Sequence, residues 1–90
     1  MRYEIKYTKQ FKKDYKLIHK QGKSIYFDEF INILANDGSL DACYKDHELK
    51  GDYVGYRECH IKSDLLLIYK KQNDIVILTC LRLGSHSDLF

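Results

Sequence analysis

The residues of this sequence that could carry out acid–base chemistry lie mostly in its C-terminal half. An imidazole group can donate or accept a proton near neutral pH, because its ordinary pKa is about 6.5. A guanidinium group can stabilise the negative charge that develops on a phosphate during cleavage. The candidates are three histidines, an aspartate and an arginine: His47, His60, His86, Asp64 and Arg82. Residues of these types suit the cleavage of RNA without a metal.

Such cleavage needs a base, an acid and a positive charge at the phosphate. The base takes the proton of a ribose 2′-hydroxyl, whose oxygen attacks the adjacent phosphate, and the acid protonates the leaving 5′-oxygen. An imidazole suits both roles, and Asp64 could either be the base or orient a histidine. The base is therefore open among His47, His60 and Asp64.

Two other interpretations of the same residues stay open. Three histidines and an aspartate could bind zinc or another transition ion, although no compact motif such as HExxH occurs. The residues could also be unrelated polar side chains on a solvated face, which is the interpretation that we prefer for His19. We expect no metal site and no cofactor.

The hydrophobic pattern changes from helical to strand-like along the chain and predicts the order β-α-α-β-β-β. The alternating segment RYEIKY predicts a strand, Thr8 could cap the helix that follows, and Gly22 would end it. Ser24 could cap a second helix that ends at Gly38. Three apolar runs separated by short polar turns then predict strands joined by hairpins: YVGYRECHI, DLLLIYK and DIVILTCLRL.

This order is typical of a two-layer α+β domain, in which two N-terminal helices pack on one face of an antiparallel sheet and leave the other face open. Strand alternation places Glu58 and His60 on the same face. A tight hairpin would bring Asp64 near His60. If the last strand pairs beside this hairpin, it also brings Arg82 and His86 alongside.

Length and composition indicate one globular domain over residues 1–90, with 44% hydrophobic and 31% charged residues. No apolar stretch approaches the roughly 20 residues that span a bilayer, and the N-terminus lacks the apolar core of a signal peptide. Three cysteines without CxxC spacing argue against disulfides and against a cysteine zinc site. We therefore expect a cytoplasmic protein with no membrane partner.

The first 23 residues carry eight lysines or arginines and two acidic residues, a net charge of +6 in a chain whose total is +2. At about 100° per residue, the lysines of the first helix fall within an arc of roughly 100°, accompanied only by Asp14. This face could be merely solvated, or it could bind RNA or an acidic protein. The residues predicted to contact the substrate are Lys9, Lys12, Lys13, Lys16 and Arg82.

The chain ends with GSHSDLF, which places a histidine and a phenylalanine where chain ends usually fray. Gly84 would let the chain turn across the open face of the sheet. Leu89 and Phe90 would then anchor the tail by packing and hold His86 beside Arg82.

Two segments resemble the YafQ branch of the RelE-type toxins of bacterial toxin–antitoxin systems: HELKGDYVGYRECHIKSDLLLIYK and LRLGSHSDLF. Ser63 and Tyr53 depart from that pattern, since proline and tryptophan are common there in the family. The resemblance implies the same fold and a ribosome-dependent mRNA endoribonuclease that uses no metal and leaves a 2′,3′-cyclic phosphate. It also implies a cognate antitoxin as a partner, besides mRNA and the ribosome.

By position, the resemblance implies a catalytic set in which the last residue supports the site: His47, His60, Asp64, His86 and Phe90. His86 would be the general acid, His60 or Asp64 the base, and Arg82 a contact to phosphate. The antitoxin would contact the basic first helix or the open face of the sheet. The alternative is a module that only binds RNA or an acidic protein through the first helix.

Overall fold

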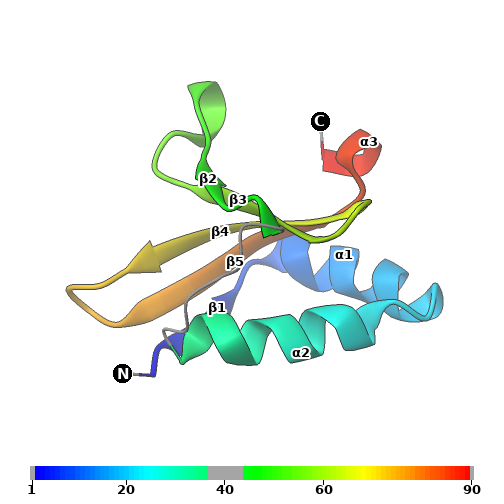
Figure 1. Ribbon diagram of the computed structural model, residues 1–90, viewed down its shortest axis with the longest axis horizontal. Helices are drawn as coiled ribbons and strands as arrows, with labels where there is room; N and C mark the ends of the chain where they lie inside the picture. The colour runs from blue at the N-terminus through cyan, green and yellow to red at the C-terminus, as the bar shows by residue number, and fades with distance from the viewer. Residues whose placement is uncertain (1, 37–43, 90) are drawn as a thin grey trace.

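The computed structural model describes residues 2–36 and 44–89 (Figure 1). The N-terminal part contains one strand and two helices: β1 (Glu4–Tyr7), α1 (Lys9–Lys20) and α2 (Ser24–Ala35). The rest contains four strands, one 3-10 turn and a short helix: β2 (His47–Glu48), η2 (Gly51–Tyr53), β3 (Arg57–Lys62), β4 (Leu65–Gln72), β5 (Ile77–Gly84) and α3 (His86–Leu89). The predicted order of the main elements is confirmed, and β2, η2 and α3 are additional to it.

The strands form one sheet in the order β1-β5-β4-β3-β2. Consecutive strands from β2 to β5 pair antiparallel, and the short turns predicted this for β3, β4 and β5. At the edge, however, β1 pairs parallel with β5. Parallel neighbours need a long crossover connection, and the path that leaves β1 through α1 and α2 provides it. The two-layer α+β class is thus confirmed, with a mixed sheet in place of the purely antiparallel one.

Local sequence signals fix both ends of α1. The hydroxyl of Thr8 accepts a hydrogen bond at 3.0 Å from the backbone N–H three residues on, as expected of an N-cap. Gly22 follows the helix with φ of 73°, a conformation that glycine adopts without strain. In α2 the N-cap is Lys23, so Ser24 is the first helical residue instead of the cap. Gly38 lies outside the described residues.

The main core lies between the sheet and the two long helices, which cover the same face (Figure 1). The strands contribute alternate side chains to it. Cys59 and Cys80 are free thiols in this core, and burial raises the pKa of both, that of Cys80 to about 12. Both helices thus serve as covers of the sheet, and no helix in the described ranges is long and apolar enough to cross a membrane.

The opposite face of the sheet carries a second, smaller core. Leu66 and Ile68 of β4 are buried there together with Leu89 of α3. Partly buried side chains pack against them: Leu49, Tyr53, Tyr56 and Leu81. The expectation of an open face is therefore wrong in part, because residues 49–56 and α3 fold over it.

Candidate active site

The candidate site residues lie on the face of the sheet that α1 and α2 leave uncovered. Strand pairing aligns four positions in one row: His47 of β2, Glu58 of β3, Ile68 of β4 and Arg82 of β5. Directly paired residues share a face, and neighbouring strands lie about 4.8 Å apart, so the row is roughly 14 Å long. The sheet thus places a histidine and the arginine of the predicted set on one face.

A second row runs beside the first and ends at the tail. It joins His60 of β3 to Leu66 of β4 and Gly84 of β5. His86 follows Gly84 by two residues, at the start of α3. The structure therefore brings His60 and His86 to the same end of the face, as the sequence predicted for a last strand that pairs beside the β3–β4 hairpin.

A β-bulge in β5 places Arg82 on this face. Cys80 faces the main core, whereas Arg82 pairs with Ile68, which belongs to the opposite core. The extra residue, Leu81, shifts the alternation by one, so that Leu83 faces the main core again. Simple alternation from Cys80 would have turned Arg82 towards the helices.

Glu58 is the most buried charged group of the site, and residue types alone did not single it out. Its side chain is 7% exposed, and its Oε1 lies 3.5 Å from Nε2 of His47 and 3.4 Å from Nε2 of His60. The centres of the two imidazole rings are 6.5 Å apart. The signal that could have revealed Glu58 is its position two residues before His60, which gives both the same face of β3.

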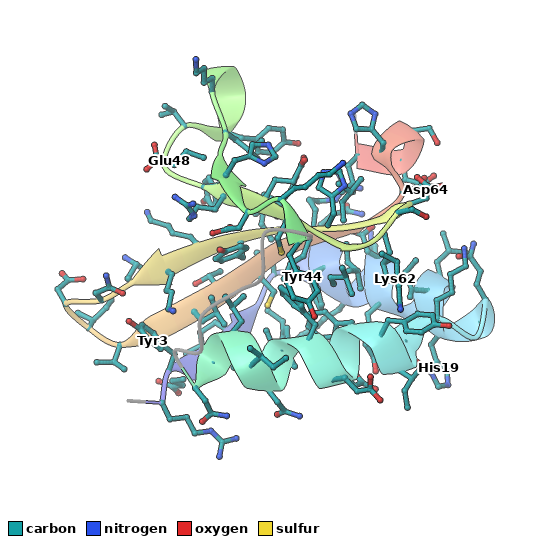
Figure 2. The ribbon with its side chains drawn as sticks, viewed as in Figure 1. Tyr3, His19, Tyr44, Glu48, Lys62 and Asp64 are labelled. Atoms are coloured by element: carbon teal, nitrogen blue, oxygen red, sulfur yellow. The ribbon has the colours of Figure 1, made fainter. Side chains whose placement is uncertain are left out.

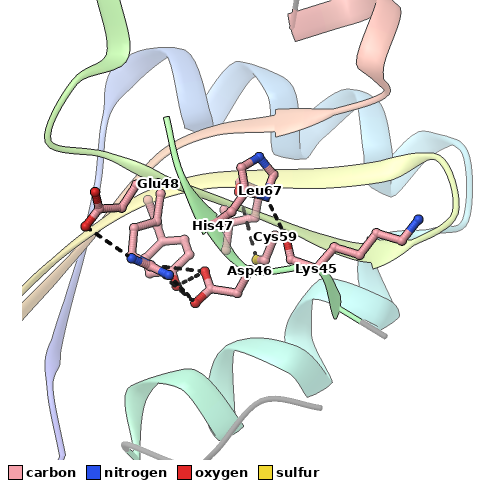
Figure 3. Close-up of polar contacts among 8 residues, drawn as sticks. Lys45, Asp46, His47, Glu48, Cys59 and Leu67 are labelled. Atoms are coloured by element: carbon pink, nitrogen blue, oxygen red, sulfur yellow. Dashed lines mark hydrogen bonds and ion pairs between the residues drawn. The ribbon is translucent and has the colours of Figure 1, made fainter. Parts of the chain in front are cut away.

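A polar network behind β2 holds His47 in place (Figure 3). Nδ1 of His47 lies 2.7 Å from the backbone carbonyl of Lys45. Asp46 accepts hydrogen bonds from Arg57 at 3.0 Å and from the hydroxyl of Tyr69 at 2.5 Å. The hydrogen bond with Asp46 raises the pKa of Arg57, while burial and then Asp46 raise that of Tyr69. The network thus keeps the two-residue strand β2 paired to β3.

Asp64 joins the turn between β3 and β4 to the tail. Figure 2 shows Asp64 beside α3, and its Oδ1 accepts a hydrogen bond at 3.4 Å from the backbone N–H of His86. The sequence predicted that Asp64 would lie near His60. The structure gives Asp64 a contact that positions the backbone of His86.

The tail is ordered by its own hydrogen bonds and by one buried side chain. The side chains of Ser85 and Asp88 each accept a hydrogen bond from the other's backbone N–H, at 3.2 and 3.3 Å respectively. Leu89 packs into the second core, as expected of an anchor. Phe90, the other predicted anchor, lies outside the described residues.

Arg82 is held by Asp14 of α1. Its Nε lies 2.8 Å from Oδ2 of Asp14, and the backbone N–H of Leu83 donates to the same oxygen at 3.1 Å. The side chains of Arg82 and Asp14 are 24% and 11% exposed. The hydrogen bond with Asp14 raises the pKa of Arg82, so the guanidinium stays charged. This contact reaches α1 because β1 has ended by this point of β5, where its last paired residue is opposite Cys80.

The predicted substrate lysines belong to the helical layer. Lys9, Lys12, Lys13 and Lys16 are all exposed on α1. They lie on the other side of the sheet from His47 and His60, so the structure does not join them to the histidines. Because Asp14 is paired with Arg82, the lysines lose their one acidic companion on α1. His19 also belongs to this layer, where its Nδ1 lies 2.9 Å from the hydroxyl of Ser24.

The described residues contain no group of three or more histidine, cysteine or acidic side chains arranged to hold a metal ion. One carboxylate oxygen of Glu58 lies within ion-pair distance of Nε2 of both His47 and His60. The site therefore combines the imidazoles of His47 and His60 with the buried carboxylate of Glu58, and Arg82 belongs to the same face of the sheet.

Residues 3–90 match the family model for a bacterial toxin of type II toxin–antitoxin systems, YafQ. The chain is 38% identical over 89 residues to the mRNA interferase toxin YafQ of Escherichia coli K12, an alignment that covers 97% of this chain and 95% of that protein.

Solved structures of high similarity cover almost every residue. The Escherichia coli DinJ–YafQ toxin–antitoxin complex matches with a TM-score of 0.87 and 37% identity, over 100% of this chain and 99% of the other. A metal-bound toxin from Helicobacter pylori matches with a TM-score of 0.87 and 42% identity, over the whole of both chains. The sequence comparisons and the structure comparison therefore both find similarity to YafQ toxins.

Proposed function

Because this chain belongs to the YafQ family of bacterial toxins of type II toxin–antitoxin systems, we propose that it is an mRNA interferase, an endoribonuclease that cleaves messenger RNA and so inhibits translation. The similar Escherichia coli toxin carries that name. The cleavage takes place on translating ribosomes, in the cytoplasm. The observation that carries the proposal is the joint placement of His47, His60 and Arg82 on one face of the sheet.

The reaction needs no group beyond those of the chain itself. A base on the sheet removes the proton of the ribose 2′-hydroxyl, and the oxygen forms a bond to the adjacent phosphorus. The bond from phosphorus to the 5′-oxygen breaks as His86 donates a proton to that oxygen. The products are a 2′,3′-cyclic phosphate and a free 5′-hydroxyl. The base belongs to the set of His47, His60 and Asp64.

Arg82 stabilises the charge that develops on the phosphate. Asp14 engages Nε and Nη2 of its guanidinium, which has five N–H donors in all. Tyr53 also forms a hydrogen bond with the Arg82 side chain. The donors that are then left can meet phosphate oxygens, and the fixed guanidinium needs no reorientation during the reaction. Asp14 is thus a positioning residue of the proposed site.

Contacts on both sides of His86 in the sequence hold the tail against the rest of the domain. Asp64 holds its backbone, and Leu89 fixes the end of α3 in the second core. We assign Phe90 the supporting role that the family resemblance implies, as a further anchor of the tail.

We expect removal of metal ions to leave cleavage unchanged, because side chains of the protein supply both proton transfers. The chain is dialysed against EDTA, freed of chelator, and then assayed with ribosomes in their own Mg²⁺ buffer. Cleavage at the rate of the untreated chain is the expected result. A loss of activity that added Zn²⁺ or Cu²⁺ restores would favour a metal site, a possibility to which the metal-bound Helicobacter pylori relative draws attention.

We further propose a cognate antitoxin as a partner, as in the complex of the Escherichia coli toxin. The antitoxin offers an acidic segment to the lysine-rich face of α1, defined by Lys9, Lys12, Lys13 and Lys16. The charge of this face is available because Asp14 is occupied by Arg82. The same lysines could instead contact ribosomal or messenger RNA, which is the second use that their charge favours.

Replacing these four lysines by glutamine distinguishes the two uses. If they contact RNA, the slope of log affinity for RNA against log salt falls by about 0.7 for each lost contact to a single strand. If they bind the antitoxin alone, RNA affinity and cleavage stay unchanged while antitoxin affinity falls. Filter binding and titration of each partner measure the two effects. The matched control is Lys6→Gln on β1, an exposed lysine that already pairs with Glu4 at 3.1 Å.

The proposed function is tested by incubating a reporter mRNA with the purified chain, with and without translating ribosomes. We expect site-specific cleavage with ribosomes present. Binding of RNA without any cleaved product would instead support the non-catalytic module.

A further inference from the structure

The β-bulge in β5 decides which face of the sheet Arg82 occupies, and it lies at a point where β5 loses its neighbour on one side. β1 pairs with β5 only as far as Cys80, and Leu81 is the extra residue of the bulge. An extra residue is left unpaired in the ladder, so its backbone groups need partners from elsewhere in the fold. The partner of the Leu81 carbonyl is the residue that caps α1.

The hydroxyl of Thr8 joins the start of α1 to the bulge. It accepts a hydrogen bond from the backbone N–H of Phe11, as its capping role requires, and donates one at 2.8 Å to the carbonyl of Leu81. A hydroxyl has one proton and two lone pairs, so both contacts exist at once. The backbone N–H of Thr8 also donates to the carbonyl of Cys80 at 3.2 Å. Thr8 thus holds two consecutive carbonyls where the bulge begins.

Asp14, on the same helix, holds the other end of the bulge. Its Oδ2 accepts hydrogen bonds from the backbone N–H of Leu83 at 3.1 Å and from Nε of Arg82 at 2.8 Å. The side-chain amide of Gln10 donates to Oδ1 of Asp14 at 3.2 Å. Because Thr8 and Asp14 belong to one capped helix, their contacts fix residues 80–83 of β5 relative to α1.

We propose that Thr8 is a positioning residue of the site: its hydroxyl fixes the bulge at Leu81 and so directs Arg82 to the face that carries His47 and His60. The inference rests on the proposed function, in which Arg82 acts on the phosphate. Without the hydroxyl, the carbonyl of Leu81 loses its partner and the bulge is free to move along β5. A shift by one residue moves a side chain to the other face of a strand.

Three substitutions of Thr8 test this role. Thr8→Val has nearly the same shape but no hydroxyl, and we expect kcat for ribosomal mRNA cleavage to fall by about 10²-fold, as for a misplacement of roughly 1 Å. Thr8→Ser keeps the hydroxyl and should restore kcat. Thr8→Gly separates capping from positioning, because glycine caps a helix nearly as well as threonine. It should stay folded and still lose kcat as Thr8→Val does.

A double-mutant cycle shows whether Thr8 acts through Arg82. In a chain that already carries Arg82→Ala, adding Thr8→Val should lower kcat little further, because the group to be positioned is gone. The matched control is Tyr15→Phe, which also removes one hydroxyl of α1. That hydroxyl donates to Asp28 at 2.8 Å and does not contact β5, so kcat should match wild type.

Hydrogen exchange of the Arg82 side chain reports its position without reference to activity. In the chain labelled with ¹⁵N-arginine, we expect the Nε–H of Arg82 to exchange slowly with water in wild type and in Thr8→Ser, because it donates to Asp14. In Thr8→Gly and Thr8→Val the exchange should be faster. Thermal unfolding shows that each variant is folded under the conditions of the measurement.

Wild-type kcat in folded Thr8→Gly would overturn the positioning role, and so would a loss in Thr8→Val that persists in full beside Arg82→Ala. A wild-type chain that cleaves no mRNA would overturn the proposed function. The exchange measurement still decides the contact in that case, since an unchanged Arg82 signal in folded Thr8→Gly would show that the hydroxyl does not hold Arg82.

Discussion

Replacing His86 by alanine lowers the rate of mRNA cleavage by about 10²–10⁴-fold while the chain stays folded. The imidazole is the proposed acid, and without it the leaving 5′-oxygen departs unprotonated. We expect the fold to survive because several contacts hold α3 without the imidazole: the backbone of His86 meets Asp64, Ser85 and Asp88 cap each other, and Leu89 is buried. Single-turnover cleavage of a ribosome-bound message measures the loss.

The matched control is Ser87→Ala, the next position of α3. Ser87 is exposed and its hydroxyl contacts Ser85 at 3.2 Å. We expect this variant to cleave at nearly the wild-type rate and to melt at nearly the same temperature. If His86→Ala remained as active as Ser87→Ala, another group would have to be the acid.

Replacing Arg82 by alanine reduces kcat by about 10²–10³-fold, because the positive charge at the phosphate is lost. It also destabilises the fold by about 1–3 kcal/mol, since Asp14 is left mostly buried without its partner. Arg82→Lys keeps the charge but not the forked geometry, so it should recover only part of the rate. Chemical denaturation and single-turnover kinetics report the two effects separately.

The double variant Arg82→Ala, Asp14→Ala separates stability from catalysis. Removing both partners leaves no unpaired carboxylate, so much of the lost stability should return. The cleavage rate should not return, because the phosphate still lacks its cation. Recovery of both together would mean that Arg82 acts through folding alone.

Much of the fold followed from local patterns in the sequence. The cap at Thr8, the left-handed Gly22 and the change from helical to alternating periodicity sufficed for the order and class of the main elements. Strand β2 could not be predicted in this way, because two residues are too few for a periodic signal. Its pairing with β3 also depends on the contact between Asp46 and Arg57, which are distant in the sequence. The parallel partner of β1 is a long-range choice that no local window contains.

The candidate site was predictable to the level of residue types and faces. Alternation placed His60 on a face with Glu58, yet the buried state of Glu58 depends on His47 from a strand that the sequence did not reveal. The bulge at Leu81 and the reach of Arg82 to α1 likewise arise from packing. The contact between the carboxylate of Asp64 and the backbone of the tail joins residues 22 positions apart, which no local pattern contains.

The most direct test of a metal-free acid–base endoribonuclease is the chemistry of the ends that it leaves. Messenger RNA bound to ribosomes is cut by the EDTA-treated chain, and the fragments are analysed by mass spectrometry and by end-specific labelling. We predict a 2′,3′-cyclic phosphate on one fragment and a free 5′-hydroxyl on the other. Fragments that carry a 3′-hydroxyl and a 5′-phosphate would show that water and not the 2′-hydroxyl attacks, and would contradict the mechanism proposed for His86, Arg82 and the base.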